Sequence, residues 1–387
     1  MAPAASAIHY VYRRRRAQVS LSVASAPSAA VRATSLYLNQ ECFKSALAGF
    51  PFVWVAEHAG EAMVDTVWAG GPPQLPLRLR PLLLSPAVVD FDRRGFRPGP
   101  AGTRAVLEAA ARAFVTGFNT ELVMPPDVAP DLGDLPEHQR GFGVEGAGTA
   151  AALLDLLNLR GGRRLASVRA IHDRRHAYLV HVGVGWALAK LHRSKLGSSG
   201  TSDAPLLRWL AYDGLGFSQA FFAGPRKLRR WAAHPAHCDA TCDIRHQGFG
   251  RSLWFRACGD PSVVAAHIER LAPRHHGDAW SGVALAAVYA GGVSLSVVER
   301  LQEIAVSQRA AVAQGAAFAA EAWHLSGHVP EHAHAAVQIL TGVELPQAAA
   351  WTRVARRSLE SSDADAADYR RWRLRIQQQA ASVLSAQ

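Results

Sequence analysis

The sequence predicts an all-α protein, an array of about six helical hairpins (an α-solenoid or α/α toroid-like array) in a curved or closed arrangement around an apolar inner groove. At six places a glycine stands four residues before another small residue in an apolar stretch, and these glycines recur at intervals of 31 to 37 residues. A break and a second amphipathic stretch follow, most clearly in the last three units. The six pairs are Gly146/Ala150, Gly183/Ala187, Gly214/Ser218, Gly248/Ser252, Gly282/Ala286 and Gly315/Ala319.

Three segments are expected along the chain. Residues 1–72 form a poorly ordered extension, because the first 40 residues contain no acidic residue and a Ser/Ala-rich stretch follows Arg13 to Arg16. A targeting leader and an upstream start codon are the alternatives. The helical-repeat domain spans 73–345, and 346–387 are expected to form a C-terminal helical tail.

Within the domain, residues 104–118 read as an amphipathic helix, since apolar residues from Val106 to Val115 recur at helical spacing. A Pro/Asp-rich linker follows over 125–136, and the repeats begin near Gly141. Breaks at Gly259-Asp260-Pro261, at Gly291-Gly292 and after Gly327 lead into second helices over 262–271, 294–304 and 330–340.

The small residues have a packing reason. Residues four apart lie on one face of a helix, so a glycine followed by alanine or serine lets two backbones approach closely. Glycine costs about 1 kcal/mol relative to alanine inside a helix, so tight packing must offset that cost. Gly-x-Gly signatures such as Gly183/Gly185 therefore indicate helix packing rather than a dinucleotide site, because no βαβ context surrounds them.

Composition narrows the class of protein. Apolar residues make up 49% of the 387 residues, and no apolar run reaches the roughly 18 residues needed to span a bilayer. We expect a soluble, cytoplasmic protein without a membrane span. The net charge is +11, but the basic residues are scattered and no nucleic-acid-binding module is recognisable, so we expect no nucleic-acid partner. Four cysteines in a chain of this length fit a reducing compartment.

A row of mostly polar residues stands directly before the repeat glycines. In stacked hairpins these positions would line one rim at the helix N-termini. The side chains either cap their helices or form a shared polar site, and both interpretations stay open. The row holds Glu145, Val182, Asp213, Gln247, Ser281 and Gln314, with His181, Tyr212, His246 and Trp280 one residue earlier.

If this row is catalytic, its residues suit acid–base chemistry. Asp213, Glu145 and Glu321 would donate or accept protons, with His181 or His246 assisting. The sequence has no Gly-x-Ser-x-Gly elbow, P-loop or His-Glu-x-x-His motif, and we expect no cofactor. An aromatic wall beside the row would bind substrate, and its candidates are Tyr212, Phe217, Trp254, Trp280, Tyr289 and Phe318.

Residues 234–246 hold three histidines and two cysteines, a set that could bind zinc through nitrogen and sulfur. The order of these residues fits no standard zinc pattern, and no second half-site accompanies them. We therefore interpret the segment as a histidine-rich loop between helices and expect no metal, with a zinc site as the alternative.

Six motifs in order are more specific than the spacing alone. They are Arg140-Gly-Phe-Gly-Val-Glu-Gly-Ala, His181-Val-Gly-Val-Gly-Trp-Ala-Leu-Ala, Tyr212-Asp-Gly-Leu-Gly-Phe-Ser-Gln-Ala-Phe-Phe, Gln247-Gly-Phe-Gly-Arg-Ser-Leu-Trp-Phe, Trp280-Ser-Gly-Val-Ala-Leu-Ala-Ala-Val-Tyr-Ala-Gly-Gly and Gln314-Gly-Ala-Ala-Phe-Ala-Ala-Glu-Ala. In these motifs, over about residues 75–345, the chain resembles the UnbL-type family. That domain of unassigned function stands beside the iterative polyketide synthase in bacterial enediyne biosynthesis clusters.

The resemblance implies a role in bacterial secondary-metabolite (enediyne-type polyketide) biosynthesis and implies no catalytic assignment. We expect a protein that acts on or holds a long, apolar, polyene-like intermediate, with other proteins of the same pathway as further partners. Whether it is an enzyme stays open. The alternatives are a non-catalytic helical-repeat scaffold that docks partner biosynthetic proteins, and a helical-repeat protein unconnected to secondary metabolism.

Overall fold

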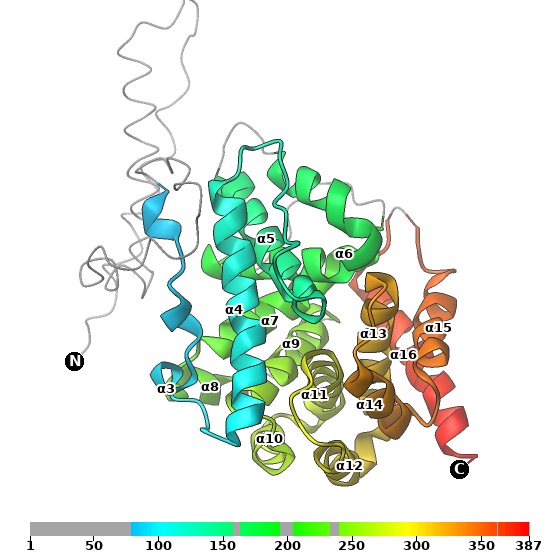
Figure 1. Cartoon of the computed structure of the whole chain (residues 1–387). Helices are drawn as coiled ribbons and strands as arrows, with labels where there is room; N and C mark the ends of the chain where they lie inside the picture. Colours follow the sequence, from blue (N-terminus) through cyan, green and yellow to red (C-terminus); the bar gives the residue numbers. More distant parts are fainter. Residues whose placement is uncertain (1–78, 158–162, 194–203, 233–239, 362, 387) are drawn as a thin grey trace, which may run out of the picture. The chain divides into compact units, whose positions relative to one another are not determined.

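A computed structural model describes residues 79–157, 163–193, 204–232, 240–361 and 363–386 (Figure 1). Across these ranges every regular element is a helix and no strand occurs, which confirms the predicted all-α class. The predicted extension over 1–72 lies outside the described residues, as do His234, His237 and Cys238 of the histidine-rich segment.

Six helices that carry the glycine pairs pack side by side in chain order, and α4 (Ala101–Val123) precedes them. Each helix contacts the next, and α13 also reaches α6, so the row curves back on itself. Residues from all six helices line a pocket on the inner side of this row. The six are α5 (Glu137–Leu157), α6 (Arg164–Lys190), α7 (Leu210–Phe221), α9 (Ala240–Arg256), α11 (His276–Ala290) and α13 (Arg309–Ser326).

The second helices of the later hairpins make a further row, in which α10 contacts α12 and α12 contacts α14 (Figure 1). Between the first two units, the second helix of one and the glycine-pair helix of the next form a single element: α6 bends at His176, where φ is −137° and ψ is 26°. The kink at His176 is the boundary between these two helices, and no glycine or proline in the sequence marks it. The second-row helices are α8 (Pro225–Ala232), α10 (Pro261–Ile268), α12 (Leu295–Ile304) and α14 (Glu331–Thr341).

The C-terminal segment, expected to be a helical tail, forms α15 (Leu345–Arg356) and α16 (Ala366–Leu384), and both pack on α13. Trp372 and Arg373 of α16 are buried, so this segment contributes to the core of the domain. Short elements complete the described chain: α3 (Phe91–Arg94) and the 3₁₀ helices η1 (Arg80–Leu82), η2 (Pro86–Val89), η3 (Leu207–Trp209), η4 (Pro273–His275) and η5 (Val306–Gln308).

The predicted breaks lie where helices end. Gly259, Gly291 and Gly327 have φ values of 75°, 65° and 77°, which glycine adopts without the strain that other residues would incur. After the first break, the carboxylate of Asp260 accepts hydrogen bonds from the backbone N–H groups of Ser262 and Val263 and so caps α10.

The repeat glycines are packed as predicted, backbone against backbone. A Cβ added at Gly248 would lie 1.9 Å from the carbonyl oxygen of Asp213, and one at Gly282 would lie 1.8 Å from that of Gln247. Gly214 and Gly315 meet the preceding helix in the same way, each at the residue just before that helix's own glycine. The spacing of the glycines thus sets the register between neighbouring helices.

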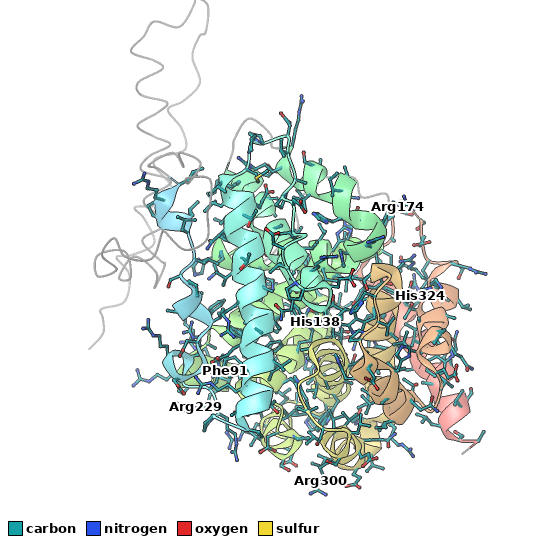
Figure 2. All side chains as sticks on the ribbon, viewed as in Figure 1. Phe91, His138, Arg174, Arg229, Arg300 and His324 are labelled. Atoms are coloured by element: carbon teal, nitrogen blue, oxygen red, sulfur yellow. The ribbon has the colours of Figure 1, made fainter. Side chains whose placement is uncertain are left out.

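The outer surface carries the charge. Arg174, Arg229 and Arg300 are exposed on α6, α8 and α12 respectively and point away from the packed helices (Figure 2). Among the helices that the structure describes, none combines the length and the apolar character required to cross a membrane.

Candidate functional site

A pocket with about 530 Å³ of atom-free space, part of it open to solvent, lies at the inner side of the row. All six glycine-pair helices contribute to its wall, which is apolar except for an aspartate, an arginine and two tyrosine hydroxyls. The lining residues are Phe142, Tyr178, Leu179, Val182, Leu210, Asp213, Arg251, Phe255, Leu285, Tyr289, Ala290, Phe318, Ala319 and Ala322.

The two charged residues of this wall, Asp213 and Arg251, belong to a buried group of three charged residues. The guanidinium of Arg251 on α9 pairs with the carboxylate of Asp213 on α7, and its other nitrogen lies 3.5 Å from the carboxylate of Glu145 on α5. Gln247 donates a 2.8 Å hydrogen bond to Asp213, and the indole N–H of Trp186 donates one of 2.9 Å to Glu145. Four helices of the row are therefore joined through one arginine and its partners.

Burial and mutual charge set the ionisation of this group. Burial raises the pKa of Glu145, the charge of Arg251 opposes the rise, and the nearby Asp213 carboxylate adds to it. Burial by itself would lower the pKa of Arg251, but the two carboxylates outweigh it and the pKa is raised. The arginine thus stays charged, and burial disfavours the ionised form of Glu145.

The structure places the predicted row inside helices rather than at their N-termini. Glu145 lies in the third turn of α5, and Gln247, Ser281 and Gln314 lie in the interiors of α9, α11 and α13. The capping interpretation is therefore wrong for these four residues, because a residue in a helix interior has no free N–H group to cap. Asp213 is in the first turn of α7, but its carboxylate binds Arg251 and Gln247.

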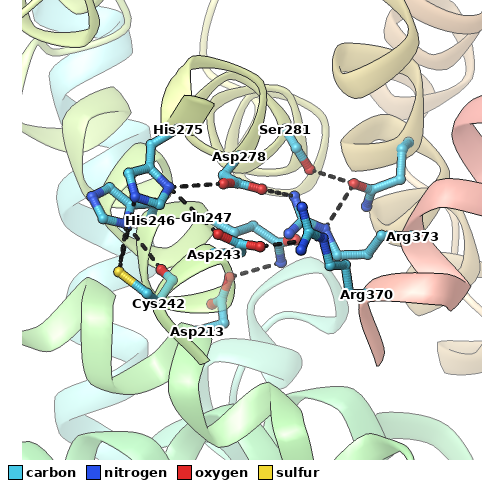
Figure 3. A network of polar contacts seen from close by, with 11 residues as sticks. Asp213, Cys242, Asp243, His246, Gln247, His275, Asp278, Ser281, Arg370 and Arg373 are labelled. Atoms are coloured by element: carbon cyan, nitrogen blue, oxygen red, sulfur yellow. Dashed lines mark hydrogen bonds and ion pairs between the residues drawn. The ribbon is translucent and has the colours of Figure 1, made fainter. Parts of the chain in front are cut away.

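Polar contacts continue along the row towards α16 (Figure 3). Ser281 donates a 2.9 Å hydrogen bond to the side-chain oxygen of Gln314, and that oxygen also accepts one of 3.1 Å from Arg373. These residues are buried, so most of the predicted row forms hydrogen-bonded contacts between adjacent helices. Only Asp213, and Val182 on its apolar side, reach the pocket itself.

Two of the six predicted aromatic residues line the pocket, Tyr289 and Phe318. The Tyr289 ring stacks on Trp323 with centroids 4.4 Å apart, and its buried hydroxyl has no hydrogen-bond partner among the described residues. This hydroxyl lies beside Gly141, where an added Cβ would be 1.9 Å from its oxygen, so glycine leaves room for it. The hydroxyl is therefore a buried polar group without a described partner, on a residue that lines the pocket.

The other four predicted aromatic residues lie outside the pocket wall. Phe217 supports it from behind, since the guanidinium of Arg251 lies 4.8 Å from its ring centroid. Tyr212 stacks on Trp209 with centroids 5.7 Å apart. Trp254 and Trp280 are buried core residues of α9 and α11.

Of the remaining predicted catalytic residues, none joins the pocket wall. Glu321 on α13 pairs with Arg353 of α15, and burial raises its pKa to about 7 against the effect of that arginine. His181 on α6 is buried, and burial followed by the charge of Arg169 lowers its pKa to about 3. His246 lies on α9 against His275 and Cys242, on a different face from Gln247 (Figure 3).

Sequence reasoning did not identify Arg251, the central cation of the site. Its position, three residues after the repeat glycine, holds Thr149, Trp186, Phe217, Leu285 and Phe318 in the other five units, four of them aromatic or aliphatic. An arginine among aromatic and aliphatic residues at equivalent positions is the signal that comparison of the units could have revealed. Arg373 had no such signal, because α16 lies outside the repeats.

The arrangement suits recognition of an apolar molecule with one polar group. The apolar wall would take up hydrocarbon, while the Tyr289 hydroxyl and the edge of the Arg251–Asp213 pair could bind a carbonyl or hydroxyl oxygen. The carboxylate of Asp213 is occupied by Arg251 and Gln247, so acid–base catalysis by Asp213 would require substrate to displace one of these partners.

Comparison with known proteins gives a family and no characterised relative. A search of the curated proteins and one of the solved structures give no match to this chain. The model of one protein family matches residues 76–380, which include α15 and nearly all of α16 as well as the repeats. The match covers well over half of the sequence, and the chain therefore belongs to the family described as Protein of unknown function (DUF1702).

Proposed function

We propose that this protein binds a largely apolar, polyene-like biosynthetic intermediate in the pocket lined by its six repeat helices. The observation that carries the proposal is the composition of that wall: aliphatic and aromatic side chains surround the single Arg251–Asp213 pair and the Tyr289 hydroxyl. Apolar burial supplies most of the binding free energy in such a site, and the few polar groups orient the ligand.

The family resemblance supports the class of ligand. UnbL-type proteins accompany an iterative polyketide synthase, whose product before cyclisation is a linear, conjugated polyene. A conjugated hydrocarbon is flat and rigid, so it suits a wall with aromatic faces such as those of Phe318 and Tyr289. The proposal therefore assigns the protein to bacterial secondary-metabolite biosynthesis of the enediyne type, in the cytoplasm where such synthases act.

A small-molecule site is better supported than a docking scaffold. A scaffold would be expected to use an open, polar concave face, whereas here α13 packs on α6 and the inner side of the row is lined mostly by apolar side chains. The buried group of Arg251, Asp213 and Glu145 also favours a small-molecule site over a scaffold. Holding Arg251, Asp213 and Glu145 together in the interior costs free energy of desolvation, a cost that pure scaffolding does not require.

Binding can be tested with cis-parinaric acid, a conjugated tetraene whose fluorescence rises in an apolar site. We expect saturable binding to the full chain and at least a tenfold loss of affinity in Leu285→Trp, because Leu285 lines the pocket and the larger ring would occupy it. The matched control is Leu295→Trp on the exposed side of α12, which should bind like the wild type. Absent or equal binding in all three proteins would refute the pocket assignment.

The biosynthetic role is tested in a producing strain that lacks the gene. Wild type should restore the product, and Leu285→Trp should leave an upstream polyene to accumulate. Asp213→Asn, which keeps the shape of the side chain, then separates two roles. Loss of product despite normal parinaric acid binding would assign Asp213 to catalysis, and normal production would assign the protein to holding the intermediate. Full restoration by Leu285→Trp would instead favour the scaffold.

A further inference from the structure

A second cluster lies on another face of α9, separate from the pocket. Cys242 and His246 are one helical turn apart on α9, and His275 ends the 3₁₀ helix η4 that leads into α11. All three side chains are buried. The sulfur of Cys242 lies 3.6 Å from Nδ1 of His246 and 3.9 Å from Nε2 of His275, and the two imidazole rings stack with centroids 3.6 Å apart (Figure 3).

We propose that Cys242, His246 and His275 bind a structural zinc ion that fastens α9 to the start of α11. One ligand atom from each residue falls in a group whose members all lie within 4.8 Å of one another. Zinc–sulfur and zinc–nitrogen bonds of about 2.3 and 2.05 Å at a tetrahedral angle place sulfur and nitrogen about 3.6 Å apart. Both sulfur–nitrogen distances are close to that value, and a thiolate with two imidazoles is a donor set that zinc favours.

The surroundings of His275 support a metal ligand. Its Nδ1 lies 3.1 Å from a carboxylate oxygen of Asp278 and 3.6 Å from one of Asp243. A proton held on Nδ1 by these carboxylates leaves the lone pair on Nε2, the nitrogen that faces Cys242. Carboxylate–histidine pairs of this kind fix the tautomer and orientation of metal-bound histidines.

The carboxylates themselves are the less suitable cation site. Asp243, His275 and Asp278 also lie close enough together to hold an ion. However, Arg373 contacts Asp278 at 2.9 Å and Arg370 contacts Asp243 at 3.4 Å, so each carboxylate already has a cation beside it (Figure 3). The two acids therefore serve as outer partners that orient His275, and the sulfur and nitrogen side of the cluster receives the metal.

Metal loading requires two local changes: the stacked imidazole rings of His246 and His275 must turn so that a nitrogen of each points at one ion, and one hydrogen bond must be replaced. Nδ1 of His246 lies 2.9 Å from the carbonyl oxygen of Cys242, so binding through this nitrogen replaces that hydrogen bond. Binding also removes the thiol proton of Cys242 and leaves both imidazoles neutral. The described residues supply three ligands, and a water molecule or a further donor completes the tetrahedron.

The direct test is the metal content of the purified full-length chain. Protein produced with zinc in the medium should contain about one zinc per chain, and Cys242→Ser and His275→Asn should each lose at least nine-tenths of it. Cys258→Ser removes a buried cysteine elsewhere and should keep the metal. Zinc retained in both cluster variants, or a metal-free wild type that takes up no zinc at micromolar concentration, would overturn the proposal.

A second measurement covers the possibility that these variants fail to fold. Wild-type protein stripped with a chelator and loaded with cobalt(II) should show a thiolate charge-transfer band and visible bands of tetrahedral cobalt. X-ray absorption of the zinc form should contain sulfur together with imidazole in its first shell. A cobalt form without the thiolate band would overturn the proposal, as would a zinc shell made only of oxygen and nitrogen.

Discussion

Gly248→Ala is the sharpest test of how the repeat helices pack. The new Cβ would lie 1.9 Å from the carbonyl oxygen of Asp213 and 2.7 Å from the backbone nitrogen of Phe217, both on α7. Ordinary contact begins at 3.4 Å, so α7 and α9 must separate locally by about 3.4 − 1.9 = 1.5 Å. Backbone atoms cannot swing aside as a side chain can, and the helices themselves must move.

The cost of this movement exceeds the gain in helix propensity. Alanine gains about 1 kcal/mol over glycine in a helix interior, whereas overpacking typically costs about 1–3 kcal/mol and more when backbone must shift. A 1.5 Å separation would also stretch the 2.8 Å hydrogen bond from Gln247 to Asp213, worth about 1.5–3 kcal/mol to a charged acceptor. We therefore expect a net loss of about 3 kcal/mol or more in the free energy of unfolding.

Thermal and urea unfolding followed by circular dichroism measure this loss. A destabilisation of about 3 kcal/mol should lower Tm by roughly 5 °C or more. Gly102→Ala is the matched control, since Gly102 also lies inside a helix, α4, but an added Cβ there meets nothing within 4 Å. It should equal or exceed the stability of the wild type. If Gly248→Ala melts together with Gly102→Ala, close backbone packing does not set the helix register.

Two further predictions concern buried charge. Arg251→Met should destabilise the fold by about 3–5 kcal/mol, because it leaves two buried carboxylates without their cation. Arg353→Met should cost less, since that arginine is one-third exposed. Equal losses of unfolding free energy in urea would contradict the conclusion that Arg251 is the cation of a buried charged group. His181, with its pKa lowered to about 3, stays neutral when folded but binds a proton in the unfolded chain below its ordinary pKa of 6.5, so it removes stability as pH falls from 6.5 towards 3. His181→Gln should therefore show a smaller drop in Tm between neutral and mildly acidic pH than the wild type, and an unchanged drop would refute the assignment.

The sequence was sufficient to predict the helical array because one physical constraint recurs six times. A glycine that must meet a neighbouring backbone appears once in each unit, and Gly248 and Gly282 meet the preceding helix in the same way. The breaks at Gly259 and Gly291 were equally predictable, because a positive φ at a helix end favours glycine. The helix boundary at His176 was not predictable, since the kink there has no glycine or proline to mark it.

The candidate site was predicted only in part. Asp213 and Glu145 were chosen for their place before the repeat glycines, and the structure brings both to Arg251. Their position along the helix was predicted wrongly. Because the sequence does not mark where each helix begins, positions inside a helix were interpreted as helix N-termini. Tyr212 was expected on the pocket side, but it immediately precedes Asp213, and a rotation of about 100° per residue turns it towards Trp209 instead.

The repeat also determines which polar side chains meet, and this rule links the two sites. Gln247 bonds Asp213 at a separation of 34 residues, Ser281 bonds Gln314 at 33, and Cys242 faces His275 at 33. These separations equal one repeat, because stacked helices with matched glycines hold equivalent positions side by side. These polar residues therefore find a partner about one period away in the next unit, whereas Arg251 also reaches Glu145 in the first unit.

Helix α9 makes such contacts one repeat apart with both the preceding and the following unit. Its Gln247 reaches back to Asp213 on α7, while Cys242 on the same helix reaches forward to His275 before α11. A metal ion on the forward contact would fix the position of α9 relative to α11, and the backward contact would carry that position to Asp213 and so to the pocket wall. A zinc ion bound by Cys242, His246 and His275 would thus hold the polar group of the pocket in register, although none of its three ligands lines the pocket. That separation is why we propose a structural rather than a catalytic metal: the three donors are buried, and the proposed metal site shares no lining residue with the pocket.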